Sequence, residues 1–221
     1  MISAPVSQVD FDSSFAEQAY RIIRDRLVML EIRPGAPIND ERLAHGLGFG
    51  RTPVREALKR LESERLVVAF PRRGTFATEV NITDLSHISE VRRQLEPTAA
   101  AAAARRATNA ERVHLVGLLT NLEGQHDPAA SWDALMRLDM RMHRAIYAAT
   151  HNPYLEDTLV RYDNLATRIW CLFADRLPNL AGHVGEHGPL LRAVIEADDS
   201  KAAELAAGHV ARFEDAIRAV V

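Results

Sequence analysis

Residues 51–67 of the chain read RTPVREALKRLESERLV, and residues 71–77 read PRRGTFA. The longer stretch predicts a helix, because its apolar residues recur at the three-and-four spacing of one buried helix face, at Val54, Leu58 and Leu61. Thr52 is placed to cap this helix, with Pro53 at its first position, where a missing N–H does no harm. The shorter stretch holds the turn between two segments rich in Val, Phe and Thr, which predict a β-hairpin.

Two further helices are expected upstream. Residues 15–30 carry apolar side chains at helical spacing, and Asn39 or Asp40 can cap a short helix that ends before the glycine-rich turn 46–50. The order is then helix, helix, turn, helix and hairpin. A helix-turn-helix of this kind places its second helix in the major groove of DNA, and a basic hairpin beside it can reach the minor groove as a wing.

Positive charge gathers on this same segment. The whole chain has a net charge of −3, but residues 42–73 carry eight Lys and Arg against three Glu, a local charge of +5. Arg51 and Arg55 lie four residues apart and share a helix face, and an arginine fork can bind a guanine edge or a phosphate. The candidate DNA contacts are Arg51, Thr52, Arg55, Lys59, Arg72, Arg73 and Gly74.

The composition excludes several classes of protein. With 47% apolar and 26% charged residues, the chain is typical of globular proteins. Its one cysteine, Cys171, excludes an internal disulfide and a multi-cysteine zinc site, which favours a reducing, cytoplasmic setting. The longest apolar run, residues 99–104, is far shorter than the roughly 20 residues that span a bilayer, so no membrane or targeting segment is expected.

After residue 80 the composition becomes alanine-rich and helix-forming, which predicts a second, all-helical domain. Helices are expected over residues 84–106, with Pro97 inside, and over 109–125, 128–150, 153–177, 189–197 and 200–220. The predicted fold is mainly α, with an N-terminal winged helix-turn-helix that includes a small β-hairpin, followed by a C-terminal helical bundle.

A candidate metal site lies in the second domain. Asp139 and His143 are four residues apart on a strongly helical segment, so both side chains can face one point. His187 and His209, from elsewhere in the domain, would complete a set of one carboxylate and three imidazoles, which suits a divalent ion such as zinc, nickel or manganese. The spacing alone leaves open whether the four residues meet.

Residues 43–78 resemble the winged helix of the GntR family of bacterial transcription regulators, through RTPVREALKRLESERLV and PRRGTFA. Residues 85–213 resemble the all-helical, FCD-type effector domain of the FadR subfamily, through EVRRQLEPTAA, LDMRMHRAIYAATHNPYL, Glu186-His187 and His209. The first resemblance implies operator contacts by Arg51, Thr52, Arg55 and Gly74. The second implies one divalent metal per chain, zinc before nickel or manganese, with ligands at Asp139, His143, His187 and His209.

The resemblance also implies an effector site. Arg92 stands where the subfamily places an arginine near the effector, and its guanidinium could pair with a small carboxylate. Arg93 is the alternative on the same segment, and Asn164 and Arg168 could also line the cavity. The tryptophans, in contrast, are expected in the core: Trp132 and Trp170.

Three positions depart from the family pattern. Gly50 stands where a serine usually precedes the arginine, and Arg65 stands where a glycine usually ends the recognition helix. Because the arginine pair remains, we expect altered affinity or sequence preference rather than loss of DNA binding. Gly188-Pro189 follows His187 where the family continues an unbroken helix. Proline is tolerated in a first turn, so His187 can lie at a helix start, and His183 is the substitute ligand if it does not.

These features predict a ligand-responsive transcription regulator. Residues 1–80 would bind DNA, and residues 81–221 would bind metal and effector and dimerise. A homodimer would match a palindromic operator in double-stranded DNA, and a small organic acid would release this repressor from it. The chain is expected not to be an enzyme. Two alternatives stay open: an enzyme that activates water at the Asp/His site, and a regulator whose metal is purely structural.

Overall fold

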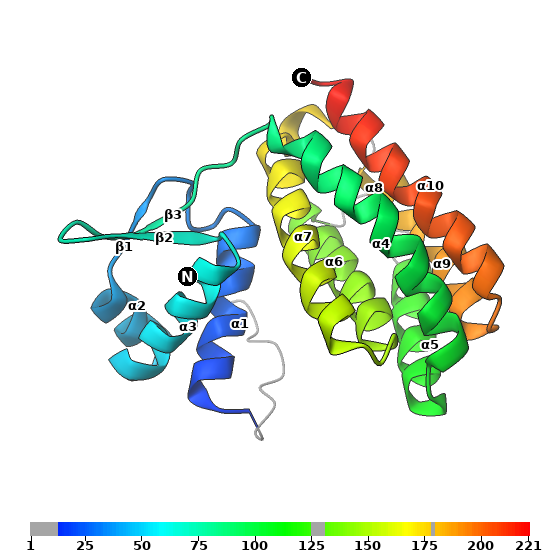
Figure 1. Cartoon of the computed structure of the whole chain (residues 1–221), viewed down its shortest axis with the longest axis horizontal. Coiled ribbons are helices and arrows are strands. Elements are labelled where there is room, and N and C mark those ends of the chain that lie inside the picture. The colour runs from blue at the N-terminus through cyan, green and yellow to red at the C-terminus, as the bar shows by residue number, and fades with distance from the viewer. Residues whose placement is uncertain (1–12, 125–130, 178–179) are drawn as a thin grey trace. The chain divides into compact units, whose positions relative to one another are not determined.

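The computed structural model describes residues 13–124, 131–177 and 180–221. The chain divides between Val80 and Asn81 into two compact units. The first combines helices with a small sheet, and the second is helical throughout its described part (Figure 1). The predicted fold class, a winged helix-turn-helix and a helical bundle, is confirmed.

The first unit is a winged helix. Its elements are α1 (Phe15–Val28), β1 (Pro37–Ile38), α2 (Asp40–Leu47), α3 (Arg51–Ser63), β2 (Val67–Phe70) and β3 (Gly74–Ala77). The strands form an antiparallel sheet in the order β1-β3-β2, with Val67 opposite Ala77 and Phe70 opposite Gly74. The strand β1 was not expected, because two residues are too few to show an alternating pattern.

Helix α1 packs against α3 and holds it in place. Their facing apolar side chains are fully buried: Ile23, Leu27, Val54 and Leu61. At the end of α3, the buried Tyr20 hydroxyl donates a 2.9 Å hydrogen bond to the Glu64 carboxylate, and the Arg60 guanidinium lies 3.7 Å above the Tyr20 ring. One face of α3 is thus fixed to α1, and the opposite face is left to solvent.

Local caps set the helix starts, and one of them differs from the prediction. Asn39 caps α2 as predicted, by accepting a 2.9 Å hydrogen bond from the backbone N–H of Arg42. Helix α3 begins at Arg51, with Gly50 in the N-cap position and no side-chain cap. The prediction that Thr52 caps this helix and Pro53 opens it is therefore wrong by two residues. Pro53 remains tolerated because first-turn N–H groups have no partner within the helix.

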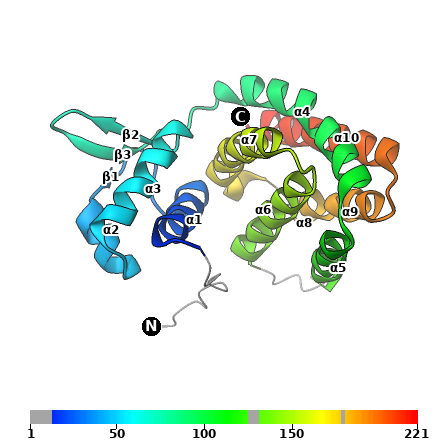
Figure 2. The ribbon, with the colours of Figure 1, turned by 60° about the horizontal axis from the view of Figure 1, so that its bottom comes forward.

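The second unit is a helical bundle (Figures 1 and 2). Its elements are α4 (Asp84–Arg106), α5 (Asn109–Gly124), α6 (Trp132–Ala148), α7 (Pro153–Leu172), the 3₁₀ turn η1 (Ala174–Arg176), α8 (Leu180–Gly185), α9 (His187–Ile195) and α10 (Asp199–Arg218). Helices α4 and α10 pack side by side, because small buried side chains allow their backbones to approach closely: Ala99, Ala103, Ala202 and Ala206. Pro97 lies inside α4, as predicted.

Several ends of helices differ from the sequence prediction. The helix expected over residues 128–150 begins at Trp132, and residues 128–130 lie outside the described residues. The helix expected to reach residue 177 ends at Leu172, and α8 was not expected. Helix α9 begins at His187, two residues before the expected start, so Pro189 occupies its first turn. None of the described helices is long and apolar enough to cross a membrane.

Candidate DNA-binding surface and metal centre

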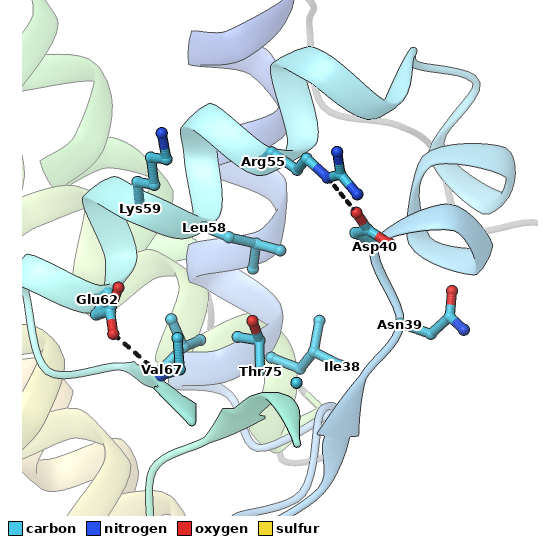
Figure 3. Close-up of a pocket in the computed structure, with 11 residues that line it drawn as sticks. Ile38, Asn39, Asp40, Arg55, Leu58, Lys59, Glu62, Val67 and Thr75 are labelled. Carbon is cyan, nitrogen blue, oxygen red and sulfur yellow. Dashed lines mark hydrogen bonds and ion pairs between the residues drawn. The ribbon is translucent and has the colours of Figure 1, made fainter. Parts of the chain in front are cut away.

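The predicted DNA contacts on α3 form one exposed strip. Arg51 is the first residue of the helix, and Arg55 lies one turn further on, with their side chains 50% and 59% exposed. Thr52 and Lys59 are also exposed. A groove of about 520 Å³ runs between α3, β1 and the β2–β3 hairpin, and Arg55 and Lys59 line it (Figure 3). The strip therefore presents two guanidinium groups and an ammonium group to solvent.

A carboxylate at the start of α2 pairs with both arginines. Asp40 accepts a 2.5 Å hydrogen bond from Nε of Arg55, and its other oxygen lies 3.5 Å from Nη2 of Arg51. Figure 3 shows the Arg55 side chain reaching from α3 toward Asp40. The hydrogen bond from Arg55 lowers the pKa of the Asp40 carboxyl. Sequence reasoning considered Asp40 only as a helix cap and missed this role.

The other predicted contacts lie at the tip of the β2–β3 hairpin. Arg72, Arg73 and Gly74 are all exposed there. Gly74 has a φ of +94°, a left-handed conformation that favours glycine, and a Cβ added to it would meet no atom within 4 Å. Arg72 adopts a φ of +64° beside it. The turn therefore presents two basic side chains and an uncovered stretch of backbone.

The four predicted metal ligands meet in the second unit. Asp139 and His143 come from α6, His187 from the first residue of α9, and His209 from α10. One donor atom from each residue lies within 4.8 Å of a donor atom from every other. Their side chains are between 0 and 6% exposed. The Gly188-Pro189 departure does not turn His187 away, because α9 begins at His187 itself.

The three histidines are held in one common orientation. Each Nδ1 atom has a partner on the protein: the Tyr147 hydroxyl at 3.0 Å from His143, the Val184 carbonyl at 3.2 Å from His187, and the Glu186 carboxylate at 2.9 Å from His209. A carbonyl and a carboxylate only accept, so His187 and His209 carry their protons on Nδ1. The Tyr147 hydroxyl can accept from Nδ1 of His143 in the same way, because a hydroxyl is both a donor and an acceptor. All three lone pairs are then on Nε2.

On this assignment two of the lone pairs lie close together, and the third has no hydrogen-bond donor. The Nε2 atoms of His143 and His187 are 3.1 Å apart, and Nε2 of His209 is buried without a hydrogen-bond partner. Oδ1 of Asp139 lacks a hydrogen bond too and lies 3.5 Å from Nδ1 of His187. Buried acceptors without donors are unfavourable, and a cation would satisfy all of them. The donor set thus fits a divalent metal ion.

The electrostatics favour the ligand forms of the histidines. Burial lowers the pKa of His143 and His209 well below the ordinary value and that of His187 to about 4. The imidazoles are therefore neutral at neutral pH, as metal ligands must be. Burial and the nearby Asp163 raise the pKa of Asp139. A bound cation would reverse this effect and keep the carboxylate ionised.

Arg92 lies beside the cluster and is buried. Its Nε atom donates to the Glu96 carboxylate at 2.5 Å, and its Nη2 atom lies 3.5 Å from Asp163. Arg92, Asp139, His143 and Asp163 line a cavity of only about 10 Å³, which is close to the space needed for one water molecule. The cavity is therefore too small, in this conformation, for an organic acid.

The remaining predicted effector residues do not line this cavity. Asn164 and Arg168 are buried on α7 but do not line it, and Asn164 accepts a 3.5 Å hydrogen bond from Arg144. Arg93 is half-exposed and pairs with Glu214. Trp170 is buried in the core, as expected, and it also lines the cavity. Trp132 is partly buried at the start of α6.

Sequence reasoning missed the residues that orient the histidines. Tyr147 stands four residues after His143 on α6, so helical spacing could have identified it. Glu186 directly precedes His187 but binds His209, which lies 23 residues away on another helix. Only the packing of α9 against α10 brings these two together.

Comparison with known proteins gives the same division of the chain. Residues 15–77 match the family model of bacterial regulatory proteins of the gntR family, and residues 87–212 match that of the FCD domain. The uncharacterized HTH-type transcriptional regulator YdhC of Bacillus subtilis is 26% identical over 158 residues, 72% of this chain and 70% of its own length. The Nta operon transcriptional regulator of Aminobacter aminovorans is 33% identical over 132 residues, 60% of this chain and 62% of its own.

A solved structure shares the fold. The structure of McbR/YncC from E. coli matches 94% of this chain and 98% of its own, with a TM-score of 0.79 and 23% sequence identity.

Proposed function

The chain is a transcription regulator of the GntR family with an FCD domain, and on this premise we propose that it is a metal-dependent repressor that a small organic acid releases from DNA. The observation that carries the proposal is the convergence, at a buried point, of one donor atom from each of Asp139, His143, His187 and His209. A homodimer would place two copies of α3 on a palindromic operator.

In this proposal one divalent ion, zinc before nickel or manganese, is held by Asp139, His143, His187 and His209. When bound, it would supply one or two further positions for the oxygens of a carboxylate. Tyr147, Glu186 and Val184 keep the three imidazoles in the Nδ1–H tautomer, so each ring presents its lone pair. In the buried centre the histidines therefore hold the ion in the same Nδ1–H tautomer that they have in the free protein.

Arg92 is the residue that would recognise the acid. Its contact with Asp163 is long, at 3.5 Å, and a carboxylate of the ligand can replace Asp163 as its partner. Because the cavity holds only about 10 Å³, the ligand can enter only if lining side chains move. Binding is then linked to a change in packing among α4, α6 and α7. A linked change of this kind can alter the operator affinity.

The DNA contacts in this proposal are the strip Arg51, Thr52, Arg55 and Lys59 on α3, and the hairpin tip at Arg72, Arg73 and Gly74. Arginine forks suit guanine edges or phosphates, and the left-handed glycine allows close approach of the backbone. Because Gly50 lacks a side chain, α3 has no hydroxyl cap that could add a phosphate contact at this point.

The experiment is metal analysis of the purified protein with three variants. We expect about one divalent ion per chain in the wild type, and loss of it in Asp139→Ala and His143→Ala. His114→Ala removes an exposed histidine on α5 and is the matched control, which should keep the ion. A folded, DNA-binding wild type without metal contradicts the proposal.

A regulator with a purely structural metal is the second candidate, and the small cavity favours it. The variant Arg92→Gln distinguishes the ligand-sensing regulator from the regulator with a structural metal. If a small acid releases the wild type from DNA but not this variant, while metal content and operator affinity are unchanged, the ion belongs to a sensor. If no small carboxylate affects DNA binding by the metal-loaded wild type, the metal is structural.

A further inference from the structure

A second group of donor atoms adjoins the proposed metal centre and shares one residue with it. His183, Glu186 and His209 each offer one ligand atom, and these atoms lie within 4.8 Å of one another. We propose that this outer group is a docking site at which a divalent ion is held before it passes to the buried centre. The inference rests on the proposed metal function and adds a path of entry.

The need for such a path follows from burial. The four side chains of the inner centre are between 0 and 6% exposed, so an ion cannot reach them directly from solvent. The Glu186 side chain is 22% exposed and that of His183 is 9% exposed. The outer group is therefore the part of the cluster nearer to water, and it contains a carboxylate, which attracts cations.

The contacts make the outer and inner groups continuous. The Glu186 oxygen that lies 2.9 Å from Nδ1 of His209 is also 3.8 Å from Nδ1 of His183. The rings of His183 and His209 stack, with centroids 4.4 Å apart and planes inclined by 21°. His183 also lines the small cavity that Asp139 and His143 line. An ion at the outer group is thus next to the inner ligands.

His209 can serve only one site at a time. A neutral imidazole has one lone pair, and the outer group would use it on Nδ1 whereas the inner centre uses it on Nε2. In the free protein the ring proton is on Nδ1 beside Glu186, so docking of the ion moves it to Nε2, and passage inward returns it to Nδ1. The two sites exclude each other, so the chain should hold one ion and never two.

Arg212 opposes entry. Its Nε atom donates a 2.5 Å hydrogen bond to the second oxygen of Glu186, and its guanidinium is half-exposed. The positive charge repels an arriving cation and occupies part of the carboxylate. An ion must compete with Arg212 for Glu186, so removal of the guanidinium should speed uptake.

The test uses the full-length protein after removal of metal with a chelator. Uptake of Co²⁺ is followed by stopped-flow absorption, and the final content is measured by elemental analysis. The variant His183→Phe keeps an aromatic ring between Trp170 and His209 but removes the nitrogen ligands. We expect it to reach one ion per chain with uptake about tenfold slower than the wild type. Arg212→Gln should take up Co²⁺ faster, and His114→Phe, an exposed control, should match the wild type.

Several results would overturn the inference. If His183→Phe takes up one ion at the wild-type rate, the outer group is not a docking site, although the proposed inner centre still stands. Two ions per wild-type chain contradict the exclusion between the sites. If His183→Phe keeps its helicity but binds no ion at the end of the uptake, His183 is instead a ligand of the resident ion. If His183→Phe does not fold, His183→Leu, which also lacks a ligand atom, replaces it with the same criteria. A wild type that takes up no Co²⁺ or Zn²⁺ refutes the proposed metal function as well.

Discussion

Asp40→Asn should make the protein a less selective DNA binder. In the free protein Asp40 lies 2.5 Å from Arg55 and 3.5 Å from Arg51, and the side chains of Arg51 and Arg55 are 50% and 59% exposed. The substitution keeps the shape of the side chain but removes its charge. The arginines then lose their fixed orientation, and the DNA phosphates no longer face a carboxylate beside them.

The size of the effect follows from the exposure of these pairs. An exposed ion pair contributes about 0.2–1 kcal/mol, so the two pairs together restrain the arginines by roughly 0.4–2 kcal/mol. Random DNA, bound through its phosphates, should be bound more tightly once the competing charge is gone. We expect the ratio of operator to random-DNA affinity to fall by roughly 2- to 30-fold, which is the same energy expressed as an affinity ratio.

Fluorescence anisotropy measures both affinities, with an operator selected from random duplexes by the wild type and a scrambled duplex of equal length. Titrations at several salt concentrations separate the phosphate contribution from base recognition. Glu41→Gln is the matched control, because it removes a charge one residue further along α2, at 3.9 Å from Arg51. A ratio equal to that of the wild type, or an equal effect of Glu41→Gln, would refute the reasoning.

Three further results are expected. Arg65 has a φ of +63°, a left-handed conformation that costs a non-glycine residue roughly 1–2 kcal/mol. Glycine avoids this cost but loses about 0.5–1 kcal/mol more conformational entropy on folding, so Arg65→Gly should stabilise the protein by about 0.5–1 kcal/mol. Thermal unfolding measures the change, and a lower Tm than that of the wild type would contradict the prediction. Burial lowers the pKa of His187 to about 4, from about 6.5 in the unfolded chain. Between about pH 4 and about pH 6.5 the unfolded chain therefore binds more protons than the folded chain. The metal-free protein should therefore lose stability as the pH falls from about 6.5 to about 4. Urea unfolding curves that do not change over this pH range would refute the lowered pKa of His187. Arg92→Gln should retain operator binding but lose its response to the acid, and release equal to that of the wild type would show that Arg92 does not bind the ligand.

Most of the fold could be predicted because its signals are local. The apolar spacing of Val54, Leu58 and Leu61 and the turn at residues 71–74 identified the winged helix, and both are present. The start of α3 was misplaced because Thr52 and Pro53 are a familiar cap pair, whereas Gly50 takes the N-cap position through its backbone alone. The strand β1 and helix α8 are too short to give a periodic pattern.

The candidate site was predictable only in part. The spacing of Asp139 and His143 places both on one face of α6, and the sequence alone supports that pair. That His187 and His209 join them depends on how α9 and α10 pack, which no spacing encodes. The pairing of Asp40 with Arg55, 15 residues away, likewise depends on the angle between α2 and α3. Family resemblance supplied the four candidates, and the structure places them together.

The most direct test of the metal centre is X-ray diffraction from crystals of the metal-loaded protein, measured on both sides of the absorption edge of the metal. We expect one anomalous peak per chain, about 2.0–2.2 Å from Nε2 of His143, His187 and His209 and from a carboxylate oxygen of Asp139. No peak at these residues, or an ion bound through Nδ1 of His209, would contradict the assignment of the lone pairs and the function built on it.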